Sequence, residues 1–266
     1  MLTSEMSRPL IYQVAVGPMT KLYKFCTDSV RQYAFSIGAD YHLQTDIILG
    51  IKPNPKRSQR SPGAIKKLGC LPIFEKECAF AHFWPHRDQI AIIDSDVWVR
   101  PGSPNVFDCL GDADFAGVRE RDTPSTPKHK KKLRMYSAMS FDTLRDVDWN
   151  LRDRTADFMN MGVMIMGGQF ASYLNGETPR EFLSRPEFQR FVDGEGHLRF
   201  STDQLLLNWW IKKTGMKVKP LGWEWNCLYG ASREGKVKEA NFVHFFLSQL
   251  LPQKGENVSV LEGLIV

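Results

Sequence analysis

A short apolar stretch that ends in two carboxylates constrains this sequence more than any other feature. The run Ile90–Ile93 has no alternation of polar residues, which is typical of a buried strand, and it leads directly into Asp94-Ser95-Asp96. On an extended backbone the two aspartates point to the same face, because they are two residues apart. Two neighbouring carboxylates in such a place would repel one another and lose hydration unless a cation bound them. The sequence therefore predicts a divalent metal site at a strand end, suited to Mg²⁺ or Mn²⁺ with a diphosphate.

The same Asp-x-Asp pattern occurs twice more, at 112–114 and at 146–148. Neither of these triplets follows an apolar run, so we expect both to lie in solvated turns or at helix ends. Only Asp94 and Asp96 have the strand context that metal chemistry needs.

Length and composition predict one globular domain over residues 1–266. Of these 266 residues, 42% are hydrophobic and 24% are charged, which is enough for one large α/β domain. No apolar run approaches the roughly 20 residues of a membrane span, and the first residues lack a signal-peptide core. The five cysteines form no Cys-x-x-Cys pair, which favours reduced thiols. We therefore expect a cytoplasmic location.

The formal net charge of +5 is concentrated in two polar segments, near 52–63 and 119–134. We interpret both segments as solvated loops. The alternative is a surface for an anionic partner, either the phosphates of a small molecule or a nucleic-acid backbone.

The order of the expected elements predicts an α/β protein. A strand at 10–16, a helix at 20–37 and a second strand at 41–49 make a β-α-β opening, which indicates a parallel sheet with a crossover helix. Further along, we expect a helix over 64–83 that Pro72 can break, strands at 114–118, 158–166 and 242–246, one or two helices over 170–191, a helix over 201–213 and an irregular tail after 252.

Five further residues, within apolar strands or at the start of a helix, could belong to the same site. His244 sits within an apolar strand, where a lone histidine is usually a core residue, but the carboxylate pair lacks a third protein ligand and Mn²⁺ accepts an imidazole more readily than Mg²⁺ does. Asn160 and Gly162 interrupt the strand at 158–166, as a bulge would, or because a ligand approaches the backbone there. Asp203-Gln204 opens a helix, either to complement its dipole or to face a substrate.

Aromatic residues are concentrated in the last third of the chain. We expect Trp209 to pack in the core, whereas Trp210, Trp223 or Trp225 could line an acceptor site, because sugars stack on aromatic faces. No nucleophile arrangement stands out, and neither a dinucleotide-binding Gly-x-Gly-x-x-Gly after the first strand nor a Walker loop is present.

Taken in order, these pieces resemble the glycogenin-like retaining glycosyltransferases of the GT-A fold, glycosyltransferase family 8 and its neighbours. The resemblance implies a GT-A-type (Rossmann-like) mixed, mostly parallel sheet flanked by helices. It also implies metal-dependent transfer from a nucleotide-diphosphate sugar, most simply a UDP-sugar, to a glycan. The two basic segments alone suggest modified DNA as a second possible acceptor. The segments that carry it are the strand and helix at 11–37, Lys67-Leu-Gly-Cys70, the run through Asp94 and Asp96, Asp157-Phe-Met-Asn-Met-Gly-Val-Met, Thr202-Asp-Gln-Leu-Leu-Leu-Asn208, Trp225-Asn226 and Val243-His-Phe.

The resemblance assigns roles to the matching positions. Asp94 would contact the ribose and the metal, while Asp96 and His244 would complete the protein ligands of Mn²⁺, with Mg²⁺ as the alternative. The other implied roles are nucleotide binding for Val14, Ala15, Val16 and Ser95; contact with the diphosphate or donor sugar for Lys67; the donor and acceptor pocket for Asn160 and Gly162; and the region of the anomeric carbon for Asp203 and Gln204. Independently of the resemblance, the aromatic faces of Trp223 and Trp225 are our candidates for acceptor stacking.

Two other classes of protein remain compatible with the sequence. A nucleotidyltransferase would also use a metal, a diphosphate and an α/β sheet, but it would need only the carboxylates and not His244. A non-enzymatic nucleic-acid-binding protein could use the segment Lys128–Arg134, but it would leave the aspartates without a role.

Overall fold

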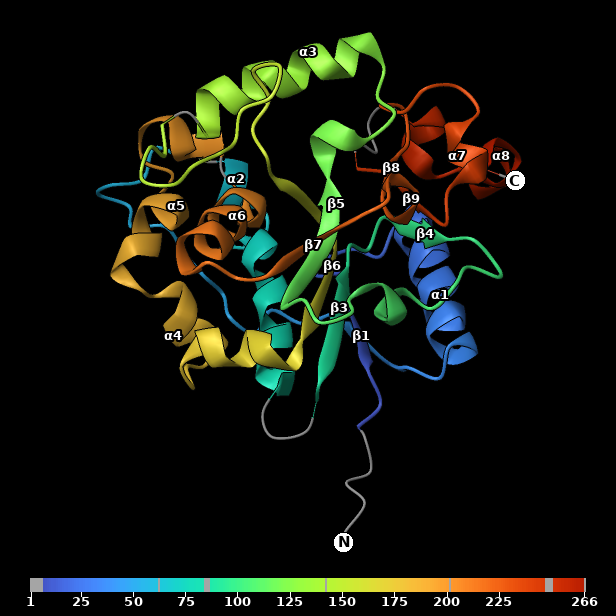
Figure 1. The fold of residues 1–266 in the computed structure, drawn as a ribbon, viewed down its shortest axis with the longest axis horizontal. Coiled ribbons are helices and arrows are strands. Elements are labelled where there is room, and N and C mark those ends of the chain that lie inside the picture. The colour runs from blue at the N-terminus through green and yellow to red at the C-terminus, as the bar shows by residue number, and fades with distance from the viewer. Residues whose placement is uncertain are drawn as a thin grey trace, which may run out of the picture.

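The centre of the molecule is a six-stranded sheet (Figure 1). The structure, a computed structural model, describes residues 7–61, 63–83, 87–141, 143–200, 202–246 and 251–265. Of the strands described in this sheet, only β6 runs antiparallel to its neighbours, which confirms the mostly parallel α/β sheet. The strand order is β2 (Asp40–Gln44), β1 (Leu10–Val14), β3 (Gln89–Ile93), β6 (Met159–Gly167), β5 (Phe115–Arg119) and β7 (Val218–Leu221).

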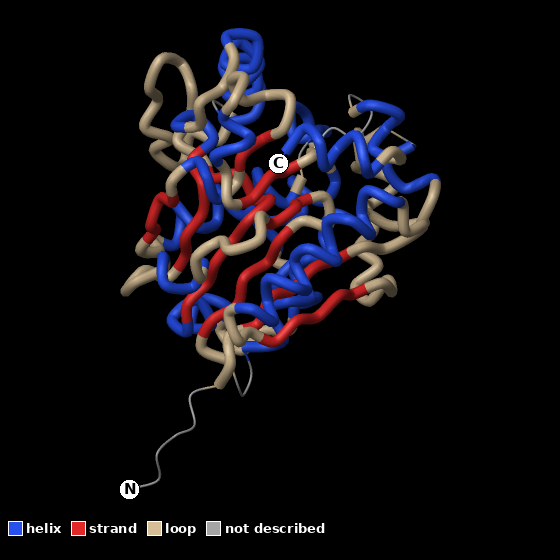
Figure 2. Tube along the Cα trace, turned by 90° about the vertical axis from the view of Figure 1, so that its right-hand side faces the viewer, coloured by secondary structure: helices blue, strands red, loops and turns tan. Residues whose placement is uncertain are grey.

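Both faces of the sheet are covered, which explains the unbroken apolar runs of its central strands. Alternate residues of β3 contribute to different cores, with Ile90 and Ile92 on one face and Ala91 and Ile93 on the other. Helix α1 (Lys21–Ser36) covers the second face, whereas the 3₁₀ segment Pro72–Phe83 and helix α6 (Asp203–Thr214) cover the first. Figure 2 shows the strands side by side between these helical layers.

A second, three-stranded sheet brings the end of the chain to the metal motif. It consists of β4 (Val97–Val99), β9 (Phe242–His244) and β8 (Cys227–Leu228), in that order. Strand β4 follows Asp96 directly and pairs antiparallel with β9, so that Val97 lies opposite His244. This register places the histidine next to Asp96, although the two residues are far apart in the sequence.

Two predicted irregular segments are helical instead, so those two predictions were wrong. The segment 119–134 contains a 3₁₀ turn at Glu120–Asp122 and helix α3 (Pro127–Tyr136). Thr126 caps α3 by accepting a hydrogen bond from His129 N, and a proline at the first helical position suits a helix start. The tail after 252 forms helix α8 (Val258–Ile265), whose Leu261 and Ile265 are buried.

The remaining elements follow the prediction more closely. The expected helix over 64–83 is broken before Pro72 into α2 (Gly63–Lys66) and the 3₁₀ segment. Residues 170–191 are divided among short turns, α4 (Pro179–Leu183) and α5 (Gln189–Asp193), and α7 (Lys236–Glu239) lies beside β8. Thr202 precedes α6, whereas Ser201 lies outside the described residues. Among the described helices, none combines the length and apolar character that crossing a bilayer requires.

The aromatic core under α4 yields a test of the fold. Phe182 is fully buried, and its ring packs edge-on against Trp210 at 4.6 Å between ring centres. We expect Phe182→Ala to lower the free energy of unfolding by about 3–5 kcal/mol, because it removes buried area and leaves a cavity. The matched control is Phe35→Ala on α1, whose ring is 88% exposed and which should change stability by no more than about 0.5 kcal/mol. Urea denaturation measures both, and equal losses would contradict the packing described.

Candidate active site

A cavity of about 280 Å³ opens at the ends of β1 and β3. Its walls include Val14, Ala15 and Val16 at the end of β1, and Asp94, Ser95 and Asp96 at the end of β3. In a mostly parallel sheet, adjacent strands such as β1 and β3 end at the same edge, which is where such proteins bind ligands. The predicted nucleotide-binding residues of both strands are thus brought together. Tyr23, Pro72, Ile73 and Lys76 complete the wall.

The backbone at Asp94 is fixed on both sides. Its N–H donates to Gly162 O at 2.9 Å, which extends the pairing of β3 with β6 by one residue. Its carbonyl accepts from Val97 N at 3.1 Å, which closes the turn into β4, and from Gln13 Nε2 at 3.0 Å. The turn therefore presents the two aspartate side chains in one place.

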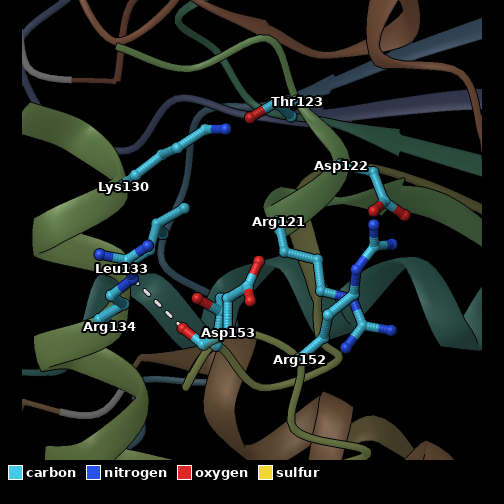
Figure 3. A pocket seen from close by; sticks show the side chains of 9 residues that line it. Arg121, Asp122, Thr123, Lys130, Leu133, Arg134, Arg152 and Asp153 are labelled. Atoms are coloured by element: carbon cyan, nitrogen blue, oxygen red, sulfur yellow. Dashed lines mark hydrogen bonds between the residues drawn. The ribbon is translucent and has the colours of Figure 1, made fainter. Parts of the chain in front are cut away.

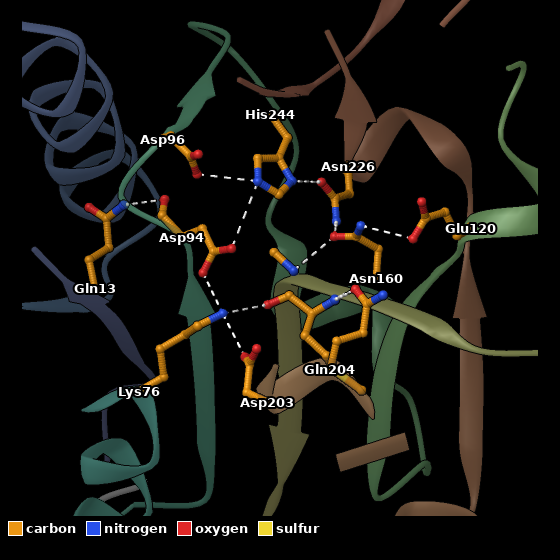
Figure 4. Close-up of polar contacts among 12 residues, drawn as sticks. Gln13, Lys76, Asp94, Asp96, Glu120, Asn160, Asp203, Gln204, Asn226 and His244 are labelled. Carbon is orange, nitrogen blue, oxygen red and sulfur yellow. Dashed lines mark hydrogen bonds and ion pairs between the residues drawn. The ribbon is translucent and has the colours of Figure 1, made fainter. Parts of the chain in front are cut away.

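Asp94, Asp96 and His244 form a cluster whose nearest ligand atoms all lie within 4.8 Å of one another (Figure 4). His244 Nε2 is 3.2 Å from Asp96 Oδ1 and 3.8 Å from Asp94 Oδ2. Burial raises the pKa of Asp94. Burial would also raise the pKa of Asp96, but the His244 imidazole outweighs that effect and holds it below its usual value. For His244, burial alone would lower the pKa, and the attraction of Asp96 outweighs it and raises it.

A chain of hydrogen bonds decides which nitrogen of His244 faces the carboxylates. The backbone N–H of Gly162 can only donate, so the oxygen of Asn160 accepts from it at 2.9 Å, and the Asn160 amide nitrogen donates to Glu120 Oε2 at 3.2 Å. The same Asn160 oxygen accepts from Asn226 Nδ2 at 2.8 Å, which turns the Asn226 oxygen toward His244 Nδ1 at 3.0 Å. Nδ1 therefore carries the proton, and Nε2 points at the aspartates.

These three side chains fit a divalent cation. Two carboxylates and one imidazole are a donor set that Mn²⁺ accepts, and metal-bound histidines commonly donate their other N–H to an oxygen, as Nδ1 of His244 does to Asn226. Without a cation, an unprotonated Nε2 would face two carboxylates. All three groups are hydrogen-bond acceptors and would repel one another, so a cation between them is favourable.

Position 162 must be a glycine because the imidazole of His244 occupies the space that a side chain would need. A Cβ at this position would lie 2.5 Å from His244 Nδ1 and 3.0 Å from Asn160 Oδ1. The sequence analysis left open a bulge or the close approach of a ligand at this point. The pairing of β6 with β5 does shift register here, and the group that lies against the Gly162 backbone is the imidazole of His244.

Lys76, which the sequence analysis did not select, is the cation at the centre of the site. Its ammonium lies 2.6 Å from Asp94 Oδ1 and 2.8 Å from Asp203 Oδ2, and it donates to Met161 O at 3.2 Å. Burial would lower its pKa, but Asp203 and Asp94 outweigh that effect and raise it. The available signal was a lysine within the buried, largely apolar segment 72–83, since such a lysine needs a charged partner.

The other predicted donor-site residues are placed less directly. Asp203 is buried and paired with Lys76, while Gln204 Oε1 accepts from Met161 N at 3.3 Å beside Gly162. Lys67 is exposed and lines none of the described wall, although its neighbour Leu68 lies near Gly17, just beyond β1. Its contact with a donor stays a prediction.

The tryptophans and the other two aspartate triplets make contacts within the protein that account for most of them. Trp225 packs against Phe242 at 5.3 Å between ring centres and is buried, which leaves no face for a sugar. Trp223 is half-buried, with Lys236 Nζ 5.4 Å from its ring centre. Trp209 and Trp210 are both buried in the core. In the triplets, Asp114 accepts from Lys217 N at 2.8 Å and Asp146 accepts from Trp209 Nε1 at 3.0 Å.

The first basic segment is largely occupied by contacts within the protein. Arg57 Nη2 lies 2.5 Å from Glu195 Oε1, and Arg60 donates to Val192 O at 2.8 Å and to Phe191 O at 2.6 Å. These contacts favour a structural role for the two arginines.

Solved structures of similar fold include glycosyltransferases, although no protein-family model and no curated protein sequence matches this chain. The galactosyltransferase LgtC, in complex with donor and acceptor sugar analogues, is 12% identical with a TM-score of 0.53, over 89% of this chain and 87% of that chain. Mouse xyloside xylosyltransferase 1 is 14% identical with a TM-score of 0.51, over 92% and 99%. A glycosyltransferase involved in glycosylation of the major capsid of PBCV-1 is 14% identical with a TM-score of 0.50, over 95% and 99%. The fold is that of GT-A-type glycosyltransferases, as the sequence predicted.

The hydrogen-bond chain to His244 predicts the effect of a substitution that leaves all three candidate metal ligands unchanged. Asn226→Ala removes the oxygen that fixes the imidazole, and loss of such a partner typically costs 10–100-fold in metal affinity. We therefore expect Mn²⁺ affinity to fall by about that factor, as measured by titration calorimetry on protein whose circular dichroism is unchanged. An affinity within about threefold of the parent protein would contradict this account of the tautomer.

A second substitution tests the room that Gly162 leaves for the imidazole. We expect Gly162→Ala to displace His244 and to lower Mn²⁺ affinity at least about 10-fold, because the added Cβ collides with the ring. Gly263→Ala is the matched control, since a Cβ there would meet nothing within 4 Å. If both variants bound Mn²⁺ as the parent does, the packing of His244 on Gly162 would be wrong.

Proposed function

We propose that this protein is a metal-dependent retaining glycosyltransferase that uses a nucleotide-diphosphate sugar and transfers the sugar to a glycan. The observation that carries the proposal is the cluster of Asp94, Asp96 and His244 beside a cavity at the ends of β1 and β3. The three solved structures of similar fold described above are named as glycosyltransferases, which supports the same reaction class. We expect a UDP-sugar as donor and Mn²⁺ as the metal, with Mg²⁺ as the substitute.

Each part of the site has a role in this proposal. Val14–Val16 would bind the base, and Asp94 and Ser95 the ribose. Asp94, Asp96 and His244 would hold a divalent metal, which when bound supplies Lewis-acid stabilisation of the charge on the departing diphosphate, worth several kcal/mol. Asn160, Gly162 and Gln204, which lie together on β6 and at the start of α6, would position the donor sugar and exclude water.

The surroundings of Asp203 favour same-face displacement over a covalent intermediate. This carboxylate is 2% exposed and its Oδ2 lies 2.8 Å from Lys76 Nζ, so using it as a nucleophile would break a buried ion pair. In the same-face reaction, the bond from the anomeric carbon to the phosphate oxygen breaks. A bond to the acceptor oxygen then forms on that face, and the acceptor proton passes to the phosphate.

Nucleotidyl transfer explains less of the site. That reaction would need the carboxylates alone, and it would give no reason for the hydrogen-bond chain that orients His244.

A thermal-shift panel tests the donor class directly. UDP- and GDP-sugars are each added with and without Mn²⁺, and a ligand that binds only the folded protein raises its melting temperature. We expect one nucleotide sugar to stabilise the protein only when Mn²⁺ is present. No shift with any of them would overturn the proposal.

Removing one proposed metal ligand tests the catalytic assignment. We expect Asp96→Asn to fold normally and to lower Mn²⁺-dependent sugar transfer or donor hydrolysis by more than about 100-fold. Loss of a residue that only supports a metal ligand already lowers metal affinity or activity by about 10–100-fold, and loss of a ligand should have a larger effect. Release of the nucleotide diphosphate measures the rate. Turnover that survives both in this variant and in parent protein treated with chelator would contradict the site.

A further inference from the structure

A second cavity, with more basic than acidic side chains in its wall, lies between α3 and the loop that precedes β6 (Figure 3). Its volume is about 310 Å³. Four cations line it, and the two carboxylates among its walls, Asp122 and Asp153, are both exposed. The cations are Arg121, Lys130, Arg134 and Arg152.

The charged residues next to this cavity include more cations than carboxylates. Three cations share the buried carboxylate of Asp157, with Arg119 Nε at 2.9 Å, Arg121 Nη2 at 3.5 Å and Lys212 Nζ at 3.9 Å. The pKa of Lys212 is lowered by burial and, in the same direction, by the neighbouring Arg119 and Arg121, although Asp157 and Asp148 oppose the shift. Asp157 carries one negative charge against the three cations that contact it, so positive charge remains beside the cavity and favours the binding of an anion.

Two of the four cations, Arg121 and Arg134, are held in place by contacts within the protein. The side chain of Arg121 is 10% exposed, and its Nη1 donates to Asn150 O at 2.6 Å. This bond ties down a loop in which Asn150, Asp153 and Arg154 all have positive φ, a conformation that side chains other than glycine adopt only at some cost. Arg134 Nε donates to Asp153 O at 3.2 Å, which joins the same loop to α3. Fixed arginines lose little freedom on binding and can clamp a planar or tetrahedral anion with two hydrogen bonds.

The cavity shares one turn with the candidate active site. Arg121 lines the cavity, while its neighbour Glu120 accepts from Asn160 Nδ2 at 3.2 Å inside the active site. Likewise, His129 on α3 lies 3.3 Å from Glu120, and the next residue, Lys130, lines the cavity. Figure 1 shows α3 lying across the end of the sheet at which β5 terminates.

We propose that this cavity binds an anionic group, a phosphate or a carboxylate, carried by the acceptor glycan. The inference rests on the proposed function, because it names the acceptor class for the same site. A cavity of this size suits one charged sugar rather than a long backbone, and the arginines of the other basic segment are engaged within the protein. The observations therefore favour a charged glycan over nucleic acid.

Titration calorimetry of the full chain tests the proposal with three sugars of similar size. Glucose 6-phosphate and glucuronate carry the two candidate anions, and glucose is the neutral reference. We expect at least one charged sugar to bind about 10-fold more tightly than glucose, with a preference that weakens as salt is added. Comparison of the two charged sugars tells phosphate from carboxylate.

Charge-removing variants locate the binding. Arg152→Gln and Lys130→Gln should each abolish most of the preference for the charged sugar, whereas Lys131→Gln, an exposed lysine on α3 that does not line the cavity, should keep it. Equal binding of charged and neutral sugars, or equal effects of all three variants, would overturn the inference. Tight binding of a short DNA duplex that Lys131→Gln weakens as much as the other two would overturn it in favour of a diffuse nucleic-acid surface.

The donor experiment separates this inference from the proposed function. If a nucleotide sugar with Mn²⁺ stabilises the protein but no charged sugar is preferred, only the acceptor inference fails. If a charged sugar is preferred but no nucleotide sugar binds, the proposed function fails, and the cavity is an anion site without that role.

Discussion

The structure around the site depends on one buried ammonium group. Lys76 has three N–H donors, and all three are used, by Asp94 at the end of β3, by Asp203 at the start of α6 and by the carbonyl of Met161 on β6. A single side chain thus joins three elements that are distant in sequence. Removing it would leave the buried carboxylate of Asp203 without its cation and would take one of the two partners from Asp94, and breaking a buried ion pair in this way is strongly destabilising.

The balance of buried charge explains why a divalent cation belongs here. The site contains three aspartates, Asp94, Asp96 and Asp203, with a formal charge of −3 in total. Lys76 neutralises one of these charges. Burial, with the neighbouring Asp203, raises the pKa of Glu77 well above its usual value, which favours the neutral form of that residue. With His244 neutral, as a metal ligand must be, two negative charges remain. One divalent cation cancels them, whereas a protonated His244 can cancel only one.

The sequence predicts best what depends on local pattern. The apolar run before Asp94 was enough to predict a buried strand. The two aspartates, however, lie in the turn after that strand and not on the extended backbone that the prediction assumed, and the register of β4 with β9 brings His244 to them. The helix at 127–136 was predictable from Thr126 followed by proline, but its many lysines were interpreted as a loop. Lys76 and Asn226 could not be assigned their roles, because a lysine in an apolar segment and an asparagine after a tryptophan acquire meaning only from partners that folding brings near.

The turn Glu120–Asp122 links the two charged regions of the molecule. Glu120 ends the hydrogen-bond chain that runs through Asn160 and Asn226 to His244, and it also contacts His129 on α3. Its neighbour Arg121 holds the loop that shapes the basic cavity. A ligand that shifts Arg121 would therefore act on the segment that orients His244, the candidate metal ligand, because Arg121 and Glu120 belong to one short turn. In a transferase this arrangement would connect occupation of the acceptor site with the geometry of the donor site.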